Sequence, residues 1–255
     1  MQDPFAALAA GYNSSGGTLR RVVRHELVDR ALAEHIAQPA SIVDVGGGAG
    51  QQALPLLRKG HEVTILDPSP KMLAEAHRRL ALEDEYVRRR ARLVEGTGER
   101  GHEALSGETF DAVLCHGVLM YLEDAQPMVY ALSALARPGG VVSVLTKNAS
   151  ALAVRPALAG RYRDALSSLE TDRDRGRLGV ITRGDTAEGL SKAFVAAGLA
   201  VEVWYGVRVF TDHLEDKVPG EDLAEILELE WEGGKREPYR STARLIHVVG
   251  RKESV

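Results

Sequence analysis

A run of glycines separates a short apolar stretch from a stretch with helical spacing. The run is Gly46-Gly47-Gly48-Ala49-Gly50, and it lies between the apolar residues Ser41–Val45 and the helix-like residues 51–58. Glycine permits a sharp turn and lets the backbone come close to a ligand. A strand that enters a helix through such a turn is the opening unit of a doubly wound parallel sheet. The run therefore predicts a strand, a tight turn able to bind a ligand, and a helix.

Strand-like and helix-like stretches alternate along the rest of the chain. Such alternation favours parallel strands joined by right-handed helical crossovers. Further strands are expected at 62–66, 93–94, 110–115, 141–145, 201–210 and 244–249. Helices are expected at 18–37, 70–80, 149–168, 186–197 and 223–231, and a charged loop at 169–185. The predicted fold class is α/β, a doubly wound, mostly parallel, seven-stranded sheet with a helical cap.

The same reading divides the chain into a core and a cap within one domain, residues 1–255. The core is expected to take residues of about 18–147, 191–210 and 243–252. The cap is expected from insertions at about 148–190 and 211–242. Because the cap comes from two separate stretches, we expect it to depend on the sheet rather than to fold alone.

Composition narrows the class of protein. Cys115 is the only cysteine, so an intrachain disulfide and a cysteine zinc site are excluded, and no metal site is expected. The start Met1-Gln2-Asp3-Pro4 lacks the basic and apolar regions of a secretory signal, and no apolar run is long enough to cross a membrane. These features predict a cytoplasmic protein. The formal net charge of -4 argues against broad binding of nucleic acid, but a local basic face remains compatible with it.

The spacing of the glycines distinguishes two classes of cofactor. A dinucleotide loop needs G-x-G-x-x-G, and counting from Gly46 the last position holds Gln51. The spacing Gly46-x-Gly48-x-Gly50, with Asp44 two residues before it, fits the loop that binds S-adenosylmethionine. The alternative is a tight strand-to-helix turn without a ligand. S-adenosylmethionine is the expected cofactor, and a nicotinamide oxidoreductase is disfavoured.

Three further positions at predicted strand ends are candidates for cofactor contacts, because ligands of doubly wound sheets bind there. Asp67 follows Gly46 by 21 residues, where a carboxylate can accept hydrogen bonds from ribose hydroxyls; it could instead be a helix N-cap. The pair Gly98-Glu99 could flank the adenine or form a surface turn. His116 could contact the cofactor or the reacting group, or be structural.

Together these residues resemble the Rossmann-like class I S-adenosylmethionine-dependent methyltransferases. A closer resemblance covers nearly the whole chain and is to the bacterial tRNA 5-carboxymethoxyuridine methyltransferase family, which methylates the wobble-base carboxylate to an ester. The matching segments outside the glycine loop are Met1-Gln2-Asp3, Leu19-Arg20, His116 with Val118-Leu119, Asn148-Ala149, 206–210 with Asp212, 227–230, Glu237-Pro238-Tyr239 and 246–248.

The resemblance implies a set of cofactor contacts. These come from Arg20, Gly47, Gly48, Asp67, the Gly98-Glu99 pair and His116, to which the loop adds Asp44 and Gly46. Arg20 would pair with the carboxylate of the methionine moiety; otherwise it would be an arginine on a solvated helix face.

The chemistry of methyl transfer to a carboxylate indicates which other residues matter. A carboxylate is already ionised near pH 7 and needs no general base, but it does need a cation to orient it. The planar fork of arginine suits that task, and the candidates are Arg155, Arg208 and Arg244. Arg208 could alternatively pair with Asp212 or Glu230 for structural reasons. Tyr162 and Tyr239 could stack on a base or belong to the core.

Three functions follow from these residues. The first is methylation of a wobble-base carboxylate in tRNA. The second is O-methylation of a small metabolite or natural product, in which His116 would be the base for a hydroxyl acceptor. The third is a non-catalytic module that binds S-adenosylmethionine and regulates a partner. The partner is accordingly tRNA or a small-molecule acceptor, with no membrane.

Overall fold

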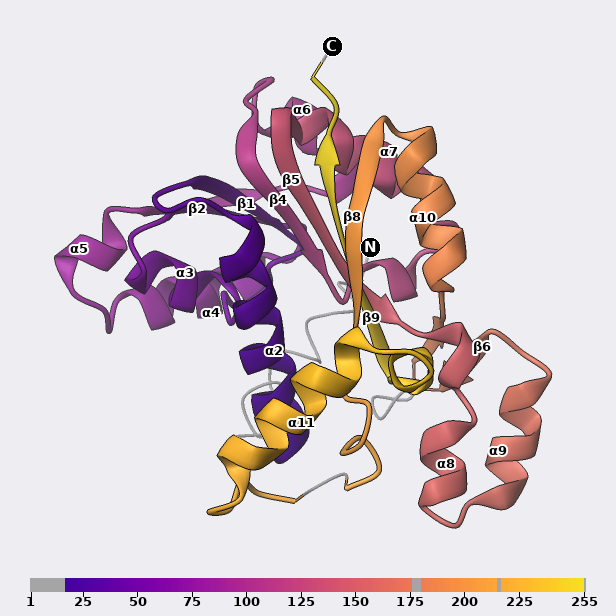
Figure 1. Cartoon of the computed structure of the whole chain (residues 1–255). Coiled ribbons are helices and arrows are strands. Elements are labelled where there is room, and N and C mark those ends of the chain that lie inside the picture. The colour runs from indigo at the N-terminus through magenta and orange to yellow at the C-terminus, as the bar shows by residue number, and fades with distance from the viewer. Residues whose placement is uncertain (1–16, 176–179, 215–216, 255) are drawn as a thin grey trace.

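The computed structural model describes residues 17–175, 180–214 and 217–254. Its centre is a seven-stranded sheet in the order β3-β2-β1-β4-β5-β9-β8 (Figure 1). All neighbouring strands are parallel except that β9 runs antiparallel to both β5 and β8. The sheet strands are β1 Ser41–Val45, β2 Glu62–Asp67, β3 Ala91–Glu95, β4 Phe110–His116, β5 Ala136–Lys147, β8 Leu199–Val207 and β9 Leu245–Lys252. The predicted fold class is confirmed.

Helices cover both faces of the sheet. They are α2 Leu19–His35, α3 Ala53–Arg58, α4 Pro70–Leu80, α5 Glu85–Arg88, α6 Gly101–Ala104, α7 Gln126–Leu135, α8 Val154–Leu158, α9 Tyr162–Leu169, α10 Ala187–Ala196 and α11 Leu223–Lys235. Short 3-10 turns are η1 Gly98–Arg100, η2 Leu119–Tyr121, η3 Ala149–Ala151 and η4 Tyr239–Thr242. The apolar side chains of α2, α3 and α4 pack on one face, and those of α7 and α10 pack on the other.

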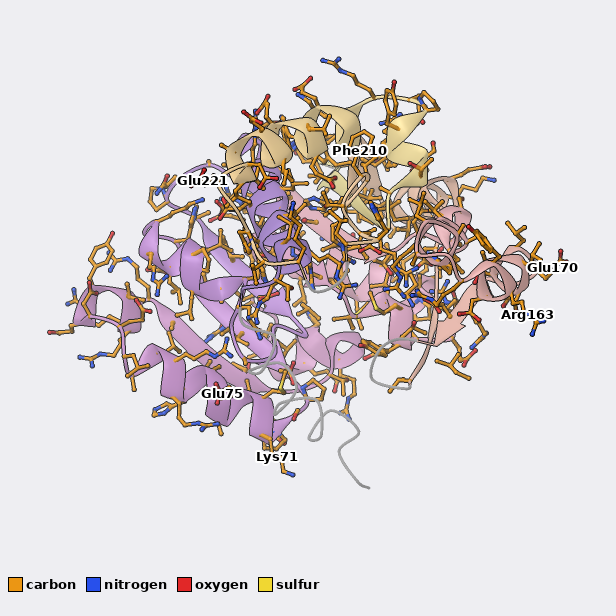
Figure 2. All side chains as sticks on the ribbon, turned by 90° about the horizontal axis from the view of Figure 1, so that it is seen from below. Lys71, Glu75, Arg163, Glu170, Phe210 and Glu221 are labelled. Carbon is orange, nitrogen blue, oxygen red and sulfur yellow. The ribbon has the colours of Figure 1, made fainter. Side chains whose placement is uncertain are left out.

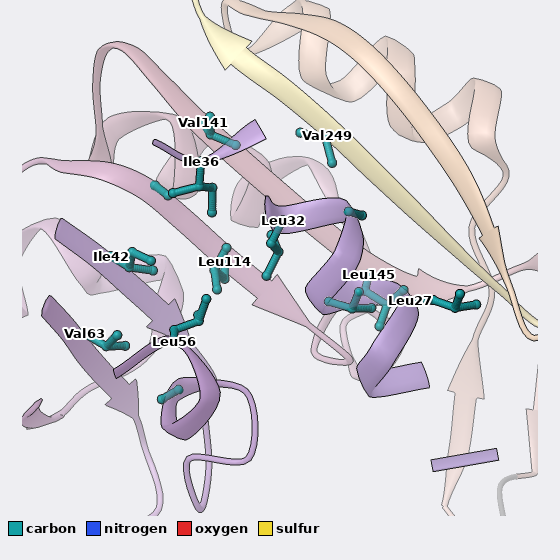
Figure 3. Packing of buried hydrophobic residues seen from close by; sticks show 14 of the residues in the cluster. Leu27, Leu32, Ile36, Ile42, Leu56, Val63, Leu114, Val141, Leu145 and Val249 are labelled. Carbon is teal, nitrogen blue, oxygen red and sulfur yellow. The ribbon is translucent and has the colours of Figure 1, made fainter. Parts of the chain in front are cut away.

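The strands supply both apolar layers because successive side chains point to opposite faces. In β1, Ile42 belongs to the layer under α2, whereas Val43 belongs to the layer under α7. Figure 3 shows Leu32 of α2, and Ile36 just after that helix, beside Leu114 of β4. A sheet buried on both faces produces nearly continuous apolar strands, which is why short apolar runs in the sequence located them correctly.

The order of the strands fixes where a ligand can bind. β1 and β4 are neighbours although β2 and β3 lie between them in sequence, so the chain leaves β1 toward one edge and β4 toward the other. Side chains and loops at the carboxyl ends of these two strands border the crevice that this reversal opens. Gly46 follows β1 and His116 ends β4, so both lie at that crevice.

Several local expectations were wrong. Residues 149–168 form η3, α8 and α9 rather than one helix, with Gly160 at φ 74° between the two helices. The expected loop 169–185 contains a hairpin of β6 Arg173–Arg175 and β7 Ile181–Arg183. Helix α7 was not predicted at all. The expected strand 201–210 ends at Val207, because Arg208 has a φ of 62° and turns the chain.

Among the described residues, no helix combines the length and apolar character needed to cross a bilayer. Within the same part of the chain, no group of three or more His, Cys, Asp or Glu side chains is placed to hold a metal ion. The α8–α9 pair projects from the sheet near its carboxyl ends, whereas α11 packs against α2 and β8 (Figure 1).

Candidate functional site

The glycine loop after β1 has a backbone that only glycine adopts without strain. Gly46 and Gly48 have φ values of 69° and 55°, in the left-handed region. A Cβ atom on Gly46 would lie 2.3 Å from Cγ2 of Val118, and one on Gly48 would lie 2.9 Å from Cε of Met72. The loop thus fits its surroundings only without side chains, and it forms a wall of bare backbone at the crevice.

Asp67 ties this loop to the end of β2. Its two carboxylate oxygens accept hydrogen bonds from the amides of Gly48 and Ser69, each at 2.9 Å. Ser69, not Asp67, is the N-cap of α4, since its hydroxyl accepts from the amide of Met72. The N-cap alternative for Asp67 was therefore wrong.

A cavity of about 270 Å³ adjoins the loop, and we call it the loop cavity. Gly98 borders it without a side chain, because a Cβ there would lie 2.6 Å from Cγ1 of Val45. The loop cavity brings together six of the residues expected to contact the cofactor: Gly46, Gly48, Asp67, Gly98, Glu99 and His116.

Asp44 lies behind the loop in a smaller cavity of about 70 Å³, which Gly47 and His116 also line. Its carboxylate is buried, and one oxygen has no hydrogen-bond partner among the described residues. Burial, and then the charge of Asp67, raise the pKa of Asp44 to about 7, while Arg24 opposes the shift. A carboxylate held in this state would gain from a cationic ligand group, such as the ammonium of a methionine moiety.

A second cavity, of about 320 Å³, has a different character. It shares Gly117 and Tyr121 with the loop cavity, so the two adjoin. Among the described residues that line it there is no carboxylate, and seven are arginine or lysine. We call it the basic cavity; its cationic residues are Arg20, Arg21, Arg24, Lys147, Arg155, Arg208 and Arg244. All three arginines expected to hold the acceptor are therefore brought together, and Arg20 lies with them rather than in the loop cavity.

Two aspartates hold part of this cluster from behind. Asp212 lies 3.2 Å from Nη1 of Arg208, 3.8 Å from Nε of Arg155 and 3.9 Å from Nε of Arg244. Asp174, in β6, accepts from Nη2 of Arg244 at 2.5 Å and from Nζ of Lys147 at 3.3 Å. The Arg208–Asp212 pair expected from sequence is present. It fixes the guanidinium without removing it from the cavity.

Glu230 binds the backbone that follows Arg208, whereas the sequence analysis considered it as a partner of the Arg208 side chain. The carboxylate is fully buried and accepts from the amides of Val209, Phe210 and Thr211, at 2.6, 3.1 and 2.8 Å. These contacts hold the chain in the turn at Arg208, whose left-handed backbone is uncommon for a residue with a side chain. Such strain is maintained only where the surroundings enforce it, often at functional sites.

The cations of the basic cavity are crowded. Burial, and then the charge of Arg244, lower the pKa of Lys147 to about 8. Burial also lowers the pKa of Arg208 to about 10, and Arg24, Arg244 and Arg20 add to the shift. Nε of Arg20, Nε of Arg208 and Nη1 of Arg244 are buried without a hydrogen-bond partner in the described part of the chain. An anionic ligand would satisfy these donors and relieve the repulsion.

His116 lines the loop cavity and the cavity around Asp44. Its Nε2 lies 2.9 Å from the hydroxyl of Ser143. Burial, followed by the charges of His247 and Arg24, holds the pKa of His116 well below its usual range. The imidazole is therefore neutral at pH 7 and a weak base.

The sequence analysis missed Lys147, Arg24 and Asp174 as parts of this site. Lys147 lies two residues after the predicted strand 141–145, so its place near a strand end was the available signal. Tyr162 and Tyr239 line none of these cavities; Tyr162 is 70% exposed and Tyr239 packs against Phe210. Figure 2 views the molecule from below, with α4 (Lys71, Glu75) on one side and, on the other, α9 (Arg163) and Glu170 just after it.

Comparison with known proteins identifies the family. Residues 43–142 match a family described as a methyltransferase domain. The tRNA 5-carboxymethoxyuridine methyltransferase of Escherichia coli O157:H7 is 31% identical over 242 residues, covering 94% of this chain and 91% of that protein. The chain belongs to the tRNA 5-carboxymethoxyuridine methyltransferase family. It is a methyltransferase whose cofactor is S-adenosylmethionine.

Other similar proteins match a smaller part of this chain or match it at lower sequence identity. A ubiquinone biosynthesis O-methyltransferase of Methylocella silvestris is 37% identical over 121 residues, covering 47% of this chain and 44% of that protein. A chain in the solved complex between the Haloferax volcanii Trm112 methyltransferase activator and a methyltransferase has a TM-score of 0.63 at 20% identity, covering 99% of each chain. The latter likeness shows the fold alone. The residues of the loop cavity and of the smaller cavity around Asp44 fit the family's cofactor, since glycines without side chains line both and Asp44 has an unpartnered oxygen.

Proposed function

We propose that this methyltransferase transfers the methyl group of S-adenosylmethionine to a carboxylate oxygen on a modified wobble uridine of tRNA. The observation that carries the proposal is the basic cavity beside the loop cavity. Its cations include three donors that lack partners, and its described lining holds no acid. A carboxylate is the nucleophile that such a cavity would bind and orient.

The residues around the glycine loop would bind the cofactor, and those of the basic cavity would bind the acceptor. Asp67 would accept hydrogen bonds from the ribose, Gly98 and Glu99 would flank the adenine, and Asp44 would face the ammonium group. Bound S-adenosylmethionine supplies an electrophilic methyl group on a sulfonium. Arg208 would hold the acceptor carboxylate as a bidentate pair, with Arg155 and Arg244 around it, so that one oxygen is aligned with the methyl group.

The charges also favour turnover. Methylation converts the carboxylate into a neutral ester, so the product loses its attraction to Arg208 and its neighbours. No proton has to leave the nucleophile, and the chain needs no general base. This agrees with the low pKa of His116, which would give little driving force for removing a proton from a hydroxyl.

A small-molecule acceptor is the second candidate. The observation favouring it is the match to ubiquinone biosynthesis O-methyltransferases, which covers about half of the chain. That match covers 47% of this chain, whereas the match to the relative named for tRNA covers 94% of it. An acceptor hydroxyl on an apolar ring would also leave the cations of the basic cavity unpaired.

The test is single-turnover methyl transfer to tRNA that carries 5-carboxymethoxyuridine, with the same tRNA lacking this modification as the control. We expect transfer only to the modified tRNA, and a product that mild alkali cleaves with release of methanol, as an ester requires. The rate should be nearly flat from about pH 5.5 to 7.5, because a carboxylate ionises near pH 4. A rate that climbs tenfold per pH unit and is lost in His116→Ala would overturn the proposal in favour of a hydroxyl acceptor.

A further inference from the structure

A line of three polar side chains crosses the middle of the sheet from the loop cavity. Nε2 of His116, in β4, lies 2.9 Å from Oγ of Ser143, in β5. The same oxygen lies 2.7 Å from Nε2 of His247, in β9. Ser143 and His247 are fully buried, and neither lines the loop cavity or the basic cavity. One hydroxyl of β5 thus bridges two imidazoles on β4 and β9, the strands on either side of it.

The number of protons on these three side chains allows only two arrangements of the hydrogen bonds between them. Burial lowers the pKa of His247 to about 3 and that of His116 well below its usual range, so both rings are neutral and each carries one proton. The hydroxyl of Ser143 has a single hydrogen and can donate to only one ring. The other ring must then donate its Nε2–H to the oxygen of Ser143. The direction of donation decides which nitrogen of His116 carries the proton.

The surroundings of His247 select between the two arrangements. Its Nδ1 is buried and has no hydrogen-bond partner in the described part of the chain. Nδ1 of His116 also has no partner there, but the ring of His116 lines two cavities, where a ligand or solvent can supply an acceptor, whereas His247 lines neither of them nor the basic cavity. A proton on Nδ1 of His247 would thus be a buried N–H that no acceptor can reach, and such groups are rare in folded proteins. His247 therefore keeps its proton on Nε2 and donates it to Ser143. Ser143 then donates to Nε2 of His116, which leaves the proton of His116 on Nδ1.

We infer that His247 and Ser143 are positioning residues that fix His116 as its Nδ1–H tautomer, so that His116 is a hydrogen-bond donor to the bound ligand and not a base. Nδ1 of His116 has no partner among the described residues, and the ring lines two cavities next to Gly46. Its partner would be an oxygen of the cofactor, since His116 lines the loop cavity and not the basic cavity. The inference concerns the protein's own protons and does not depend on what the acceptor is.

The test is the ¹⁵N spectrum of histidine-labelled protein without ligand, which separates protonated from unprotonated ring nitrogens. Resonances are assigned with His116→Gln and His247→Gln. We expect His116 protonated on Nδ1 and His247 protonated on Nε2. In Ser143→Ala the Nε2–H form of His116 should become populated. S-adenosylhomocysteine should then bind about 5–10-fold more weakly, the loss of one hydrogen bond of ordinary strength.

Ser133→Ala is the matched control. Ser133 is a buried serine of α7 whose hydroxyl donates to the carbonyl of Ala197, in the apolar layer on the other side of the sheet from α2. It should lower the melting temperature as Ser143→Ala does, yet leave the nitrogen shifts of His116 and the affinity for S-adenosylhomocysteine unchanged. A native protein with His116 protonated on Nε2, or equal effects of the two serine variants on His116, would overturn the inference. Neither result would bear on whether tRNA is the acceptor.

Discussion

The loop cavity and the basic cavity lie side by side but are built in different ways. The loop cavity is formed by strand ends and by glycines whose backbone cannot tolerate a side chain. The basic cavity is formed by long cationic side chains from α2, from the ends of β5 and β8, from α8 and from the start of β9. The first is shaped by backbone and suits one cofactor, whereas the second is shaped by charge and suits a class of acceptor. Variants should therefore separate cofactor binding from acceptor binding.

The largest effect is expected for Arg208→Lys. Lysine keeps the charge but loses the fork that holds a carboxylate through two hydrogen bonds. Single-turnover methyl transfer to the modified tRNA should slow by about 100-fold, since losing one hydrogen bond between charged groups costs about 1.5–3 kcal/mol. The dissociation constant of S-adenosylhomocysteine, measured by calorimetry, should not change.

Arg236→Lys is the matched control, because Arg236 is a surface arginine at the end of α11 that pairs with Glu232. It should leave transfer unchanged. Equal rates for the native protein and Arg208→Lys would remove Arg208 from the acceptor site.

Asp67→Ala should act on the other cavity. Ribose hydroxyls would lose a charged acceptor, and each such hydrogen bond contributes about 1.5–3 kcal/mol, so the dissociation constant of S-adenosylhomocysteine should rise roughly 10–100-fold. Asp84→Ala removes another aspartate that accepts a backbone amide, that of Val87 at the start of α5. It should lower stability without affecting binding. If the two variants bind S-adenosylhomocysteine equally well, Asp67 only supports the loop.

Arg20→Ala tests whether Arg20 binds the cofactor or the acceptor. The family resemblance implies that Arg20 pairs with the methionine carboxylate, yet its side chain lines the basic cavity. We expect the dissociation constant of S-adenosylhomocysteine to rise about tenfold, the loss of one charge-assisted hydrogen bond, with little change in melting temperature. An unchanged dissociation constant with a raised KM for tRNA would assign Arg20 to the acceptor instead.

The smallest effect is a pH dependence from Lys147. Its pKa is lowered to about 8, so its charge is present below that pH and is lost as the pH rises through it. Asp174 next to it stays ionised, because Arg244 and Lys147 hold its pKa below the usual range despite burial. The KM for modified tRNA should therefore rise about threefold between pH 7.5 and 8.5.

Lys147→Arg should abolish that rise, since arginine remains charged throughout the range. A rise that persists unchanged in Lys147→Arg would show that another group titrates.

The sequence predicted the loop cavity better than the basic cavity. Gly46, Gly48 and Asp67 were found because a turn of this kind imposes a fixed spacing on residues close in sequence. Arg155, Arg208 and Arg244 were proposed from chemistry and resemblance, and only the fold showed that they meet. Lys147 and Asp174 were missed, since a lysine after a strand and an aspartate in a charged stretch carry no local signal of their partners.

Local sequence determined the strands, most of the helices and the glycine turn, because backbone geometry and apolar periodicity act over a few residues. It also determined the class of cofactor. The tertiary structure alone decided the left-handed turn at Arg208, the contacts of Asp174 with Arg244 and Lys147, and the line from His116 to His247. Those features depend on packing between residues distant in sequence, 21 apart for Val209 and Glu230, 70 for Asp174 and Arg244, and 104 for Ser143 and His247. Their charges and protons are set by burial that arises only after the sheet has assembled.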